Sequence, residues 1–240
     1  MKKLVVITGA GSGFGKEIAH IFNKANHPLL LLGRRPELME EYGFDNCLVR
    51  KVDVNDKESF EKAIREAEAL YGKTDLLVNN AGVMLLGNVA YQDSSEWQTM
   101  LNTNVMGVLN GMQVVLDNMI KDNTGTIINV SSIAGRKSFG NHAAYCASKY
   151  GVHALSETIR EEVSGSNLRV MVIAPGAAET SLLEHTTSQD IKDGYNEWKE
   201  TMGGVSLDPK KVAESIKFMY DMPQEVNIRE LVIASTKQDQ

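Results

Sequence analysis

The sequence has few cysteines, few histidines and no long apolar run. Its two cysteines, Cys47 and Cys146, form no Cys-x-x-Cys pair, so we expect neither a disulfide framework nor a cysteine-ligated zinc site. The five histidines form no His-Glu-x-x-His motif, and we predict no metal site. The apolar runs, such as 29–32, are far shorter than the roughly 20 residues that a membrane helix needs.

An excess of positive charge is also absent. The chain carries 25 Lys and Arg against 31 Asp and Glu, which gives a formal net charge of -6. This balance argues against a dedicated surface for nucleic acid or for an anionic membrane. Near the amino terminus, the apolar stretch 4–7 is shorter than the roughly 7 to 15 residues of a secretory signal. We therefore expect a reduced, cytoplasmic protein.

What the sequence does contain is a regular alternation of short apolar segments with amphipathic ones. The apolar, β-branched segments predict buried strands at 4–8, 29–32, 48–54, 76–78, 126–130, 169–174 and 231–233. Helical spacing of apolar residues predicts helices that include 56–71, 96–119, 144–163 and 208–220. The alternation predicts an α/β fold: a Rossmann-like, doubly wound parallel sheet of about seven strands with helices on both faces, in one domain over 1–240.

One segment, 177–205, interrupts this alternation. It is rich in Thr, Ser, Glu, Lys and Gly and lies between a predicted strand and a predicted helix. Insertions of this length inside a compact domain are usually functional. We predict a substrate lid at about 177–205.

A glycine-rich turn follows the first predicted strand and fits the pattern Gly-x-x-x-Gly-x-Gly. The Gly-x-Gly-x-x-Gly fingerprint and the P-loop pattern both fail in this stretch. Glycine lets a pyrophosphate lie against bare backbone, and the start of the next helix offers unpaired N–H groups. The turn therefore predicts a dinucleotide site with the contacts Gly9, Ser12, Gly13, Phe14 and Gly15.

Two arginines, Arg34 and Arg35, follow the second predicted strand. An acid at about this distance from the glycine turn usually holds the ribose hydroxyls of NAD, and none occurs between positions 29 and 36. Guanidinium groups suit a 2′-phosphate because they form fork-shaped, charge-assisted hydrogen bonds. A solvated charge pair is the alternative interpretation, but beside the glycine turn the arginines favour NADP(H) over NAD(H).

Four further motifs follow in order: Asn79-Asn80-Ala81-Gly82, Ser131-Ser132-Ile133-Ala134-Gly135, Tyr145-Cys146-Ala147-Ser148-Lys149, and Pro175-Gly176 with Thr180. With the glycine turn they resemble the short-chain dehydrogenase/reductase family, in its single-domain branch, over the whole chain. The resemblance implies an NADP-dependent oxidoreductase acting on the CH–OH group of an alcohol or on a small carbonyl compound, and a homodimer or homotetramer. The stretch 223–231 also resembles the NADP-dependent 3-hydroxy acid (serine-type) dehydrogenases, which suggests a small 3-hydroxy acid.

The resemblance assigns catalytic roles to Asn104, Ser132, Tyr145 and Lys149. It implies that Ser132 binds the reacting oxygen and that Asn104 holds a relay water. Tyr145 and Lys149 are four residues apart and share a helix face, so we expect the ammonium to lower the pKa of the phenol. The cofactor contacts implied by the resemblance are Asp53, Val54, Asn80, Ala81, Gly82, Tyr145, Lys149, Pro175, Gly176 and Thr180.

Two alternative functions remain at this stage. A 3-oxoacyl-acyl-carrier-protein reductase needs a basic docking surface, which only Arg136-Lys137 suggests; a solvated loop pair is the favoured interpretation of these two residues. A non-catalytic NADPH-sensing protein has no need of an intact set of catalytic residues. His142, close to Tyr145 in sequence, could contact the substrate, but a structural histidine is the favoured interpretation.

Overall fold

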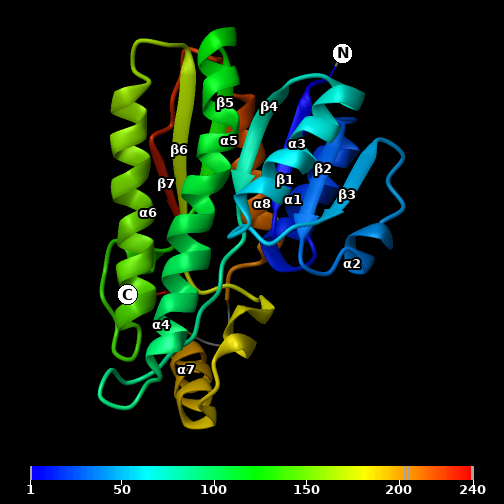
Figure 1. The fold of residues 1–240 in the computed structure, drawn as a ribbon. Helices are drawn as coiled ribbons and strands as arrows, with labels where there is room; N and C mark the ends of the chain where they lie inside the picture. Colours follow the sequence, from blue (N-terminus) through cyan, green and yellow to red (C-terminus); the bar gives the residue numbers. More distant parts are fainter. Residues whose placement is uncertain (1, 203, 205, 239–240) are drawn as a thin grey trace.

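The computed structural model describes residues 2–202, 204 and 206–238 (Figure 1). Its strands form one parallel sheet in the order β3-β2-β1-β4-β5-β6-β7. The strands are β1 (Leu4–Thr8), β2 (Leu29–Gly33), β3 (Cys47–Lys51), β4 (Thr74–Asn79), β5 (Gly125–Val130), β6 (Leu168–Pro175) and β7 (Glu230–Ile233). The predicted α/β, Rossmann-like sheet of seven parallel strands is confirmed.

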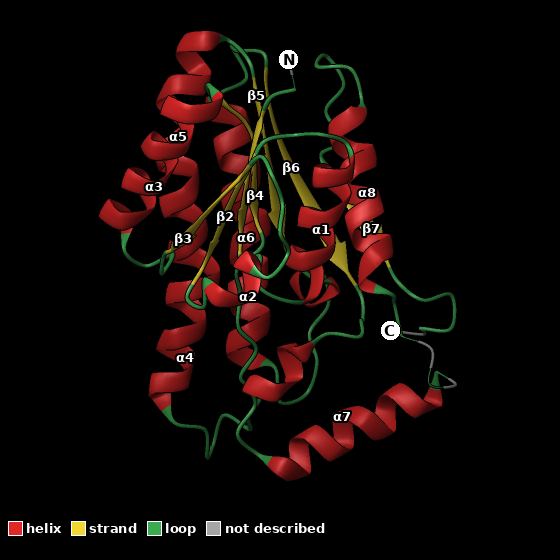
Figure 2. Ribbon diagram, turned by 90° about the vertical axis from the view of Figure 1, so that its right-hand side faces the viewer, coloured by secondary structure: helices red, strands yellow, loops and turns green. Residues whose placement is uncertain are grey.

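Helices cover both faces of this sheet (Figure 2). On one face lie α1 (Gly13–Lys24) and α8 (Pro209–Asp221), which pack against each other and against Val5 and Ile7 of β1. On the other face α3 (Lys57–Tyr71), α5 (Gly107–Asp122) and α6 (Ala143–Glu162) pack against the alternate residues of the same strand. Every residue of β1 is therefore buried, which explains its largely apolar sequence.

The order of the strands places a crevice beside β1. The chain builds β2 and β3 on one side of β1 and then returns to build β4 on the other side. The connection after β1 therefore runs to β2 on one side, and the connection after β4 runs to β5 on the opposite side. In open α/β sheets, ligands bind at such a switch point.

The helical region predicted over 96–119 is divided in the structure. It consists of α4 (Ser94–Leu101), a π-helical turn (Asn102–Met106) and α5. The N–H group of Gly107 donates to the carbonyl of Asn102, five residues back. This single wide turn places Asn104 inside the protein, with 1% of its surface exposed.

The third strand is shorter than the predicted 48–54. Its pairing ends where Lys51 lies opposite Gly33, the last residue of β2. Because β3 is an edge strand, it has no second partner that could extend it. The chain then turns toward α3, and Val54 packs close to Gly107 of α5.

The segment 177–205 contains secondary structure of its own. A 3-10 turn (Ser181–His185) precedes α7 (Gln189–Thr201), and none of the residues of α7 is buried. Figure 2 shows α7 apart from the sheet and its covering helices. Gly203 and Val205, at the end of the predicted lid, lie outside the described residues.

Within the described part of the chain, no helix combines the length and apolar composition needed to cross a bilayer. A short helix, α2 (Glu37–Glu40), follows β2.

Candidate active site

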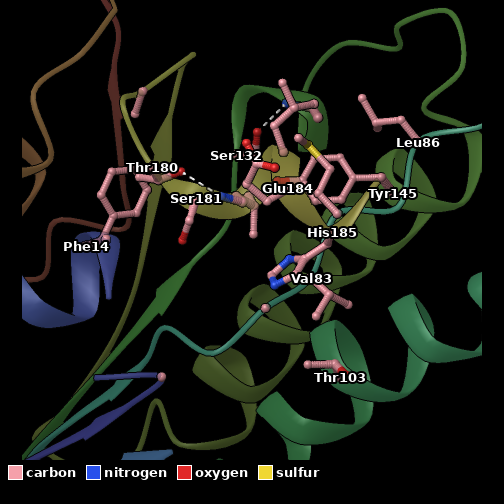
Figure 3. A pocket seen from close by; sticks show the side chains of 18 of the residues that line it. Phe14, Val83, Leu86, Thr103, Ser132, Tyr145, Thr180, Ser181, Glu184 and His185 are labelled. Carbon is pink, nitrogen blue, oxygen red and sulfur yellow. Dashed lines mark hydrogen bonds between the residues drawn. The ribbon is translucent and has the colours of Figure 1, made fainter. Parts of the chain in front are cut away.

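A cavity of about 1170 Å³ lies at the carboxyl ends of β2, β5 and β6, beside the glycine turn. In Figure 3, Phe14 and Thr180 lie on one side and Tyr145 and Leu86 on the other. Two predicted site residues, Gly15 and Asn104, do not line it. The predicted site residues in its wall are Gly9, Ser12, Gly13, Phe14, Arg34, Arg35, Asp53, Val54, Asn80, Ala81, Gly82, Ser132, Tyr145, Lys149, Pro175, Gly176 and Thr180.

The glycine turn requires glycine for two different reasons. Gly9 and Gly13 have positive φ angles of 64° and 50°, in the left-handed region that favours glycine. Gly15 has an ordinary φ, but a Cβ atom there would collide with the carbonyl of Gly9 and would lie 2.6 Å from Nδ2 of Asn80. Gly15 thus allows α1 to approach the turn and acts behind the cavity wall.

Hydrogen bonds join the end of β4 to this turn. Nδ2 of Asn80 donates to the carbonyls of Thr8 at 2.9 Å and Gly9 at 3.1 Å. Oγ1 of Thr8 accepts from the backbone N–H groups of Asn80 and Ala81, each at 3.0 Å. Asn80 therefore shapes the backbone of the turn, which fixes the floor of the cavity.

The end of the cavity at β2 is electropositive. Arg34 and Arg35 are exposed in its wall, and neither forms an ion pair with a carboxylate of the described residues. The pKa of His185, in the 3-10 turn, is lowered first by burial and then by the charges of these two arginines. Asp53 is turned toward its own loop, where Oδ1 accepts from the backbone and side chain of Asn55 at 2.9 Å.

Tyr145 and Lys149 lie on the first turns of α6, at the other end of the cavity. Nζ of Lys149 is 5.8 Å from the centroid of the Tyr145 ring and donates to the carbonyl of Val130 at 3.0 Å. Burial raises the pKa of Tyr145, while a hydrogen bond with Ser132 lowers it. Burial also lowers the pKa of Lys149 to about 8. The predicted lowering of the phenol pKa is therefore wrong for the protein alone, because desolvation of the phenol is the largest effect and outweighs the hydrogen bond with Ser132.

Ser132 caps the 3-10 turn Ile133–Gly135. Its Oγ accepts from the N–H group of Ala134 at 3.1 Å, which leaves the hydroxyl hydrogen for another partner. The neighbouring Ser131 donates its hydroxyl to the carbonyl of Lys149 at 3.2 Å. The two adjacent serines thus differ: Ser131 is bonded to α6, and Ser132 is oriented toward Tyr145.

Asn104 holds the wall of the site from behind. Its Oδ1 accepts from the N–H group of Val83 at 2.8 Å, and Nδ2 donates to the Val83 carbonyl at 2.9 Å. The same Nδ2 donates to Oγ of Ser148, on α6, at 3.0 Å. Both amide hydrogens are used, so Nδ2 has none left to donate to a relay water, while Oδ1 keeps a second lone pair.

Sequence reasoning did not single out the residues that enclose the cavity around Tyr145, although two of them, Tyr195 and Trp198, lie in the predicted lid. His142, predicted to be structural, lines the cavity, as do three aromatic residues that no motif marked: Phe139, Tyr195 and Trp198. Only the amphipathic pattern of α7 hinted that part of this helix faces the protein. Arg136 does not line the cavity; it forms an ion pair with Glu230.

Comparison with known proteins agrees with this site. Residues 3–191 match the short chain dehydrogenase family. An uncharacterized oxidoreductase of Staphylococcus saprophyticus is 34% identical over 242 residues, which cover 98% of this chain and 97% of the relative. The protein belongs to the short-chain dehydrogenase family, as its motifs predict.

Within this family, the fold is similar to that of serine dehydrogenase. The closed form of serine dehydrogenase complexed with NADP+ has a TM-score of 0.92 and 30% identity, covering 99% of this chain and 96% of that chain. Serine dehydrogenase from Escherichia coli has a TM-score of 0.85 and 29% identity, covering 99% of this chain and 100% of that chain. The predicted likeness to the serine-type group is thereby confirmed.

Proposed function

We propose that the protein is an NADP-dependent oxidoreductase that interconverts an alcohol and a carbonyl compound, with a small 3-hydroxy acid as one candidate substrate. The observation that carries the proposal is one cavity with Ser132, Tyr145 and Lys149 at one end and, at the other end, two arginines that pair with no carboxylate of the described residues. The similarity to a serine dehydrogenase complexed with NADP+ supports both the cofactor and the candidate substrate.

The residues along the cavity fit an extended dinucleotide. Gly9 and Gly13 expose backbone at the start of α1, where a pyrophosphate is stabilised by unpaired N–H groups. Arg34 and Arg35 bind the 2′-phosphate, and Lys149 binds the nicotinamide ribose. NADPH, when bound, supplies the hydride. The remaining contacts in this proposal are Ser12, Phe14, Asp53, Val54, Asn80, Ala81, Gly82, Pro175, Gly176 and Thr180.

Tyr145 is the general acid and base in this proposal. Because burial keeps its pKa high, the phenol is protonated near neutral pH and can donate a proton to a carbonyl oxygen. Ser132, which hydrogen-bonds Tyr145 in the structure, donates its hydroxyl hydrogen to the same oxygen when the carbonyl compound is bound. Alcohol oxidation needs the phenolate, which the ammonium of Lys149 stabilises. A water near Asn104 connects the site to solvent.

The segment 177–205 acts as a lid over this cavity. Residues of the 3-10 turn and of α7 line it, yet α7 has no buried residue, as expected of an element that can move. The proposal includes a homodimer or homotetramer in the cytoplasm.

Neither alternative is supported by a specific observation. Arg136 is paired with Glu230, which removes half of the basic pair that an acyl carrier protein would need. A protein that only binds NADPH and catalyses no reaction would not need Ser132 beside Tyr145.

The proposal is tested by following NADPH absorbance with a panel of aldehydes, ketones and diones, and NADP+ reduction with 3-hydroxy acids. We expect turnover with at least one carbonyl compound, and turnover lowered by about 10²- to 10⁴-fold in Tyr145→Phe. A protein that binds NADPH but turns over no member of either panel would be a sensor instead.

A further inference from the structure

The cavity around Tyr145 is enclosed by aromatic rings from two distant segments. Phe139 and His142 belong to the loop before α6, with ring centroids 5.6 Å apart. Tyr195 and Trp198 belong to α7, with ring centroids 5.3 Å apart.

Contacts between the two segments make these rings one wall. His142 lies 6.2 Å from Tyr195, and Phe139 lies 6.4 Å from Trp198, between ring centroids. His142 also lies 6.3 Å from the ring of Tyr145, the proposed proton donor. The wall therefore borders the position of the reacting oxygen.

Within the described residues, the lysines of α7 that line the cavity near this wall are paired, and Lys137, whose Nζ is 5.8 Å from the centroid of the Phe139 ring, does not line the cavity. On α7, Nζ of Lys192 is 3.7 Å from a carboxylate oxygen of Glu184, and Nζ of Lys199 is 3.0 Å from one of Glu179. Lys149 donates to a backbone carbonyl and is assigned to the cofactor ribose. The unpaired guanidinium groups that line the cavity within the described residues are at its opposite end. Among the described residues, a substrate carboxylate thus finds no free cation in the cavity wall beside Tyr145.

The polar atoms of the wall are uncharged. Nδ1 of His142 lies 2.6 Å from the carbonyl of Gly140, so this nitrogen carries the proton and Nε2 is an acceptor in the neutral ring. Burial lowers the pKa of His142, which favours that neutral ring. Nε1 of Trp198 is buried without an acceptor. The wall can therefore bind flat apolar surface, and the N–H group of Trp198 and the hydroxyl of Tyr195 are uncharged donors for a neutral oxygen.

From this wall we infer that the substrate is an uncharged aromatic ketone, aldehyde or dione, whose ring packs among Phe139, His142, Tyr195 and Trp198 while its carbonyl oxygen faces Tyr145. Aromatic rings stack in offset or edge-to-face arrangements, which suits a wall whose own rings are tilted. The inference rests on the proposed function and selects its substrate class. The small 3-hydroxy acid becomes the competing substrate.

A matched pair of probes tests the inference. 1-Phenylpropane-1,2-dione and butane-2,3-dione differ by a phenyl group in place of a methyl group. We expect kcat/KM with NADPH to be at least about tenfold higher for the phenyl compound, since filling an apolar pocket discriminates by this order. We also expect oxidation of serine and 3-hydroxybutyrate with NADP+ to be slower than oxidation of 1-phenylethanol.

The outcomes separate the inference from the proposed function. If butane-2,3-dione is reduced as well as the phenyl compound, or a 3-hydroxy acid is the better alcohol, the aromatic class is wrong and the oxidoreductase stands. If no probe of either kind is turned over although NADPH binds, both proposals are wrong.

Variants of Trp198 test whether the aromatic wall causes the preference for the phenyl compound. In Trp198→Leu, we expect the ratio of kcat/KM between the two diones to fall about tenfold. Trp198→Phe keeps a ring and removes the N–H group, so it should retain most of the ratio. Phe218→Leu is the matched control, because Phe218 lies on α8, is 55% exposed and is outside the cavity. An unchanged ratio in a folded Trp198→Leu variant, checked by its melting curve, overturns the inference.

Discussion

The cofactor preference of the protein should depend on Arg34 and Arg35. Both guanidinium groups line the cavity and neither is held by a carboxylate of the described residues. They are therefore free to form charge-assisted hydrogen bonds with a 2′-phosphate, which NADPH has and NADH lacks. Replacing both by alanine removes these bonds and leaves the glycine turn and Lys149 intact.

The size of the effect follows from the exposure of the two side chains. A hydrogen bond to a charged group contributes about 1.5–3 kcal/mol, and solvent screening favours the lower value for exposed groups. Two such bonds give about 3 kcal/mol, which is roughly a 150-fold change in relative affinity. We expect kcat/KM for NADPH to fall by about this factor in Arg34→Ala/Arg35→Ala, and kcat/KM for NADH to change little.

The assay compares the two cofactors at saturating carbonyl substrate and at two ionic strengths. Arg136→Ala is the matched control, because it removes the same charge from a residue paired with Glu230 outside the cavity. Salt should weaken NADPH binding in the wild type more than in the double variant. Equal use of NADPH and NADH by the wild type, or an equal loss with both cofactors in the variant, would refute the reasoning.

Three further predictions concern the proton donor, its lysine and the lid. Tyr145→Phe should lower turnover by about 10²- to 10⁴-fold, the usual contribution of general acid–base catalysis, and should keep NADPH binding, measured by calorimetry; wild-type turnover in that variant would contradict the assignment. The pKa of Lys149 is lowered to about 8 in the folded protein. Between pH 8 and 10 the lysine is therefore mostly deprotonated in the folded state but still protonated in the unfolded chain, so the free energy of unfolding should rise over this range. Denaturant titrations should show a smaller rise in Lys149→Met, which should also bind cofactor more weakly and oxidise alcohols at a higher optimal pH. Hydrogen exchange over 177–205 should be fast in the protein alone and slow with cofactor and substrate, whereas exchange that is slow throughout would contradict a lid.

The strands and the cofactor turn were predictable because their causes are local. A strand covered on both faces, such as β1, needs apolar residues along its length, and its one polar residue, Thr8, is satisfied by hydrogen bonds to the end of β4. The glycines of the turn are required by backbone conformation and by one close approach, both of which depend on neighbouring residues. The motifs of the candidate site could therefore be located in the sequence, and the structure brings most of them to one cavity.

The rest depends on contacts between distant parts of the chain. The π-helical turn has wider hydrogen bonds than an α-helix, such as that from Gly107 to Asn102, and leaves no periodic signal. The raised pKa of Tyr145 follows from how deeply the whole cavity buries it, which spacing to Lys149 does not reveal. The aromatic wall combines residues near position 140 with residues near 196, and only the fold joins them.

The segment between β6 and α8 also has a consequence for the order in which molecules enter and leave. At its start, the side chain of Thr180 lies beside the glycine turn, close enough that a Cβ atom on Gly13 would be 3.3 Å from Cγ2. Further along, Tyr195 borders the aromatic wall. One continuous piece of chain thus contacts both the glycine turn and the aromatic wall. A bound dinucleotide that orders the chain around Thr180 therefore also orders the chain around Tyr195, which forms part of the wall. We expect compulsory-order kinetics, with the nucleotide binding first and leaving last, and with NADP+ competing against NADPH but not against the carbonyl compound.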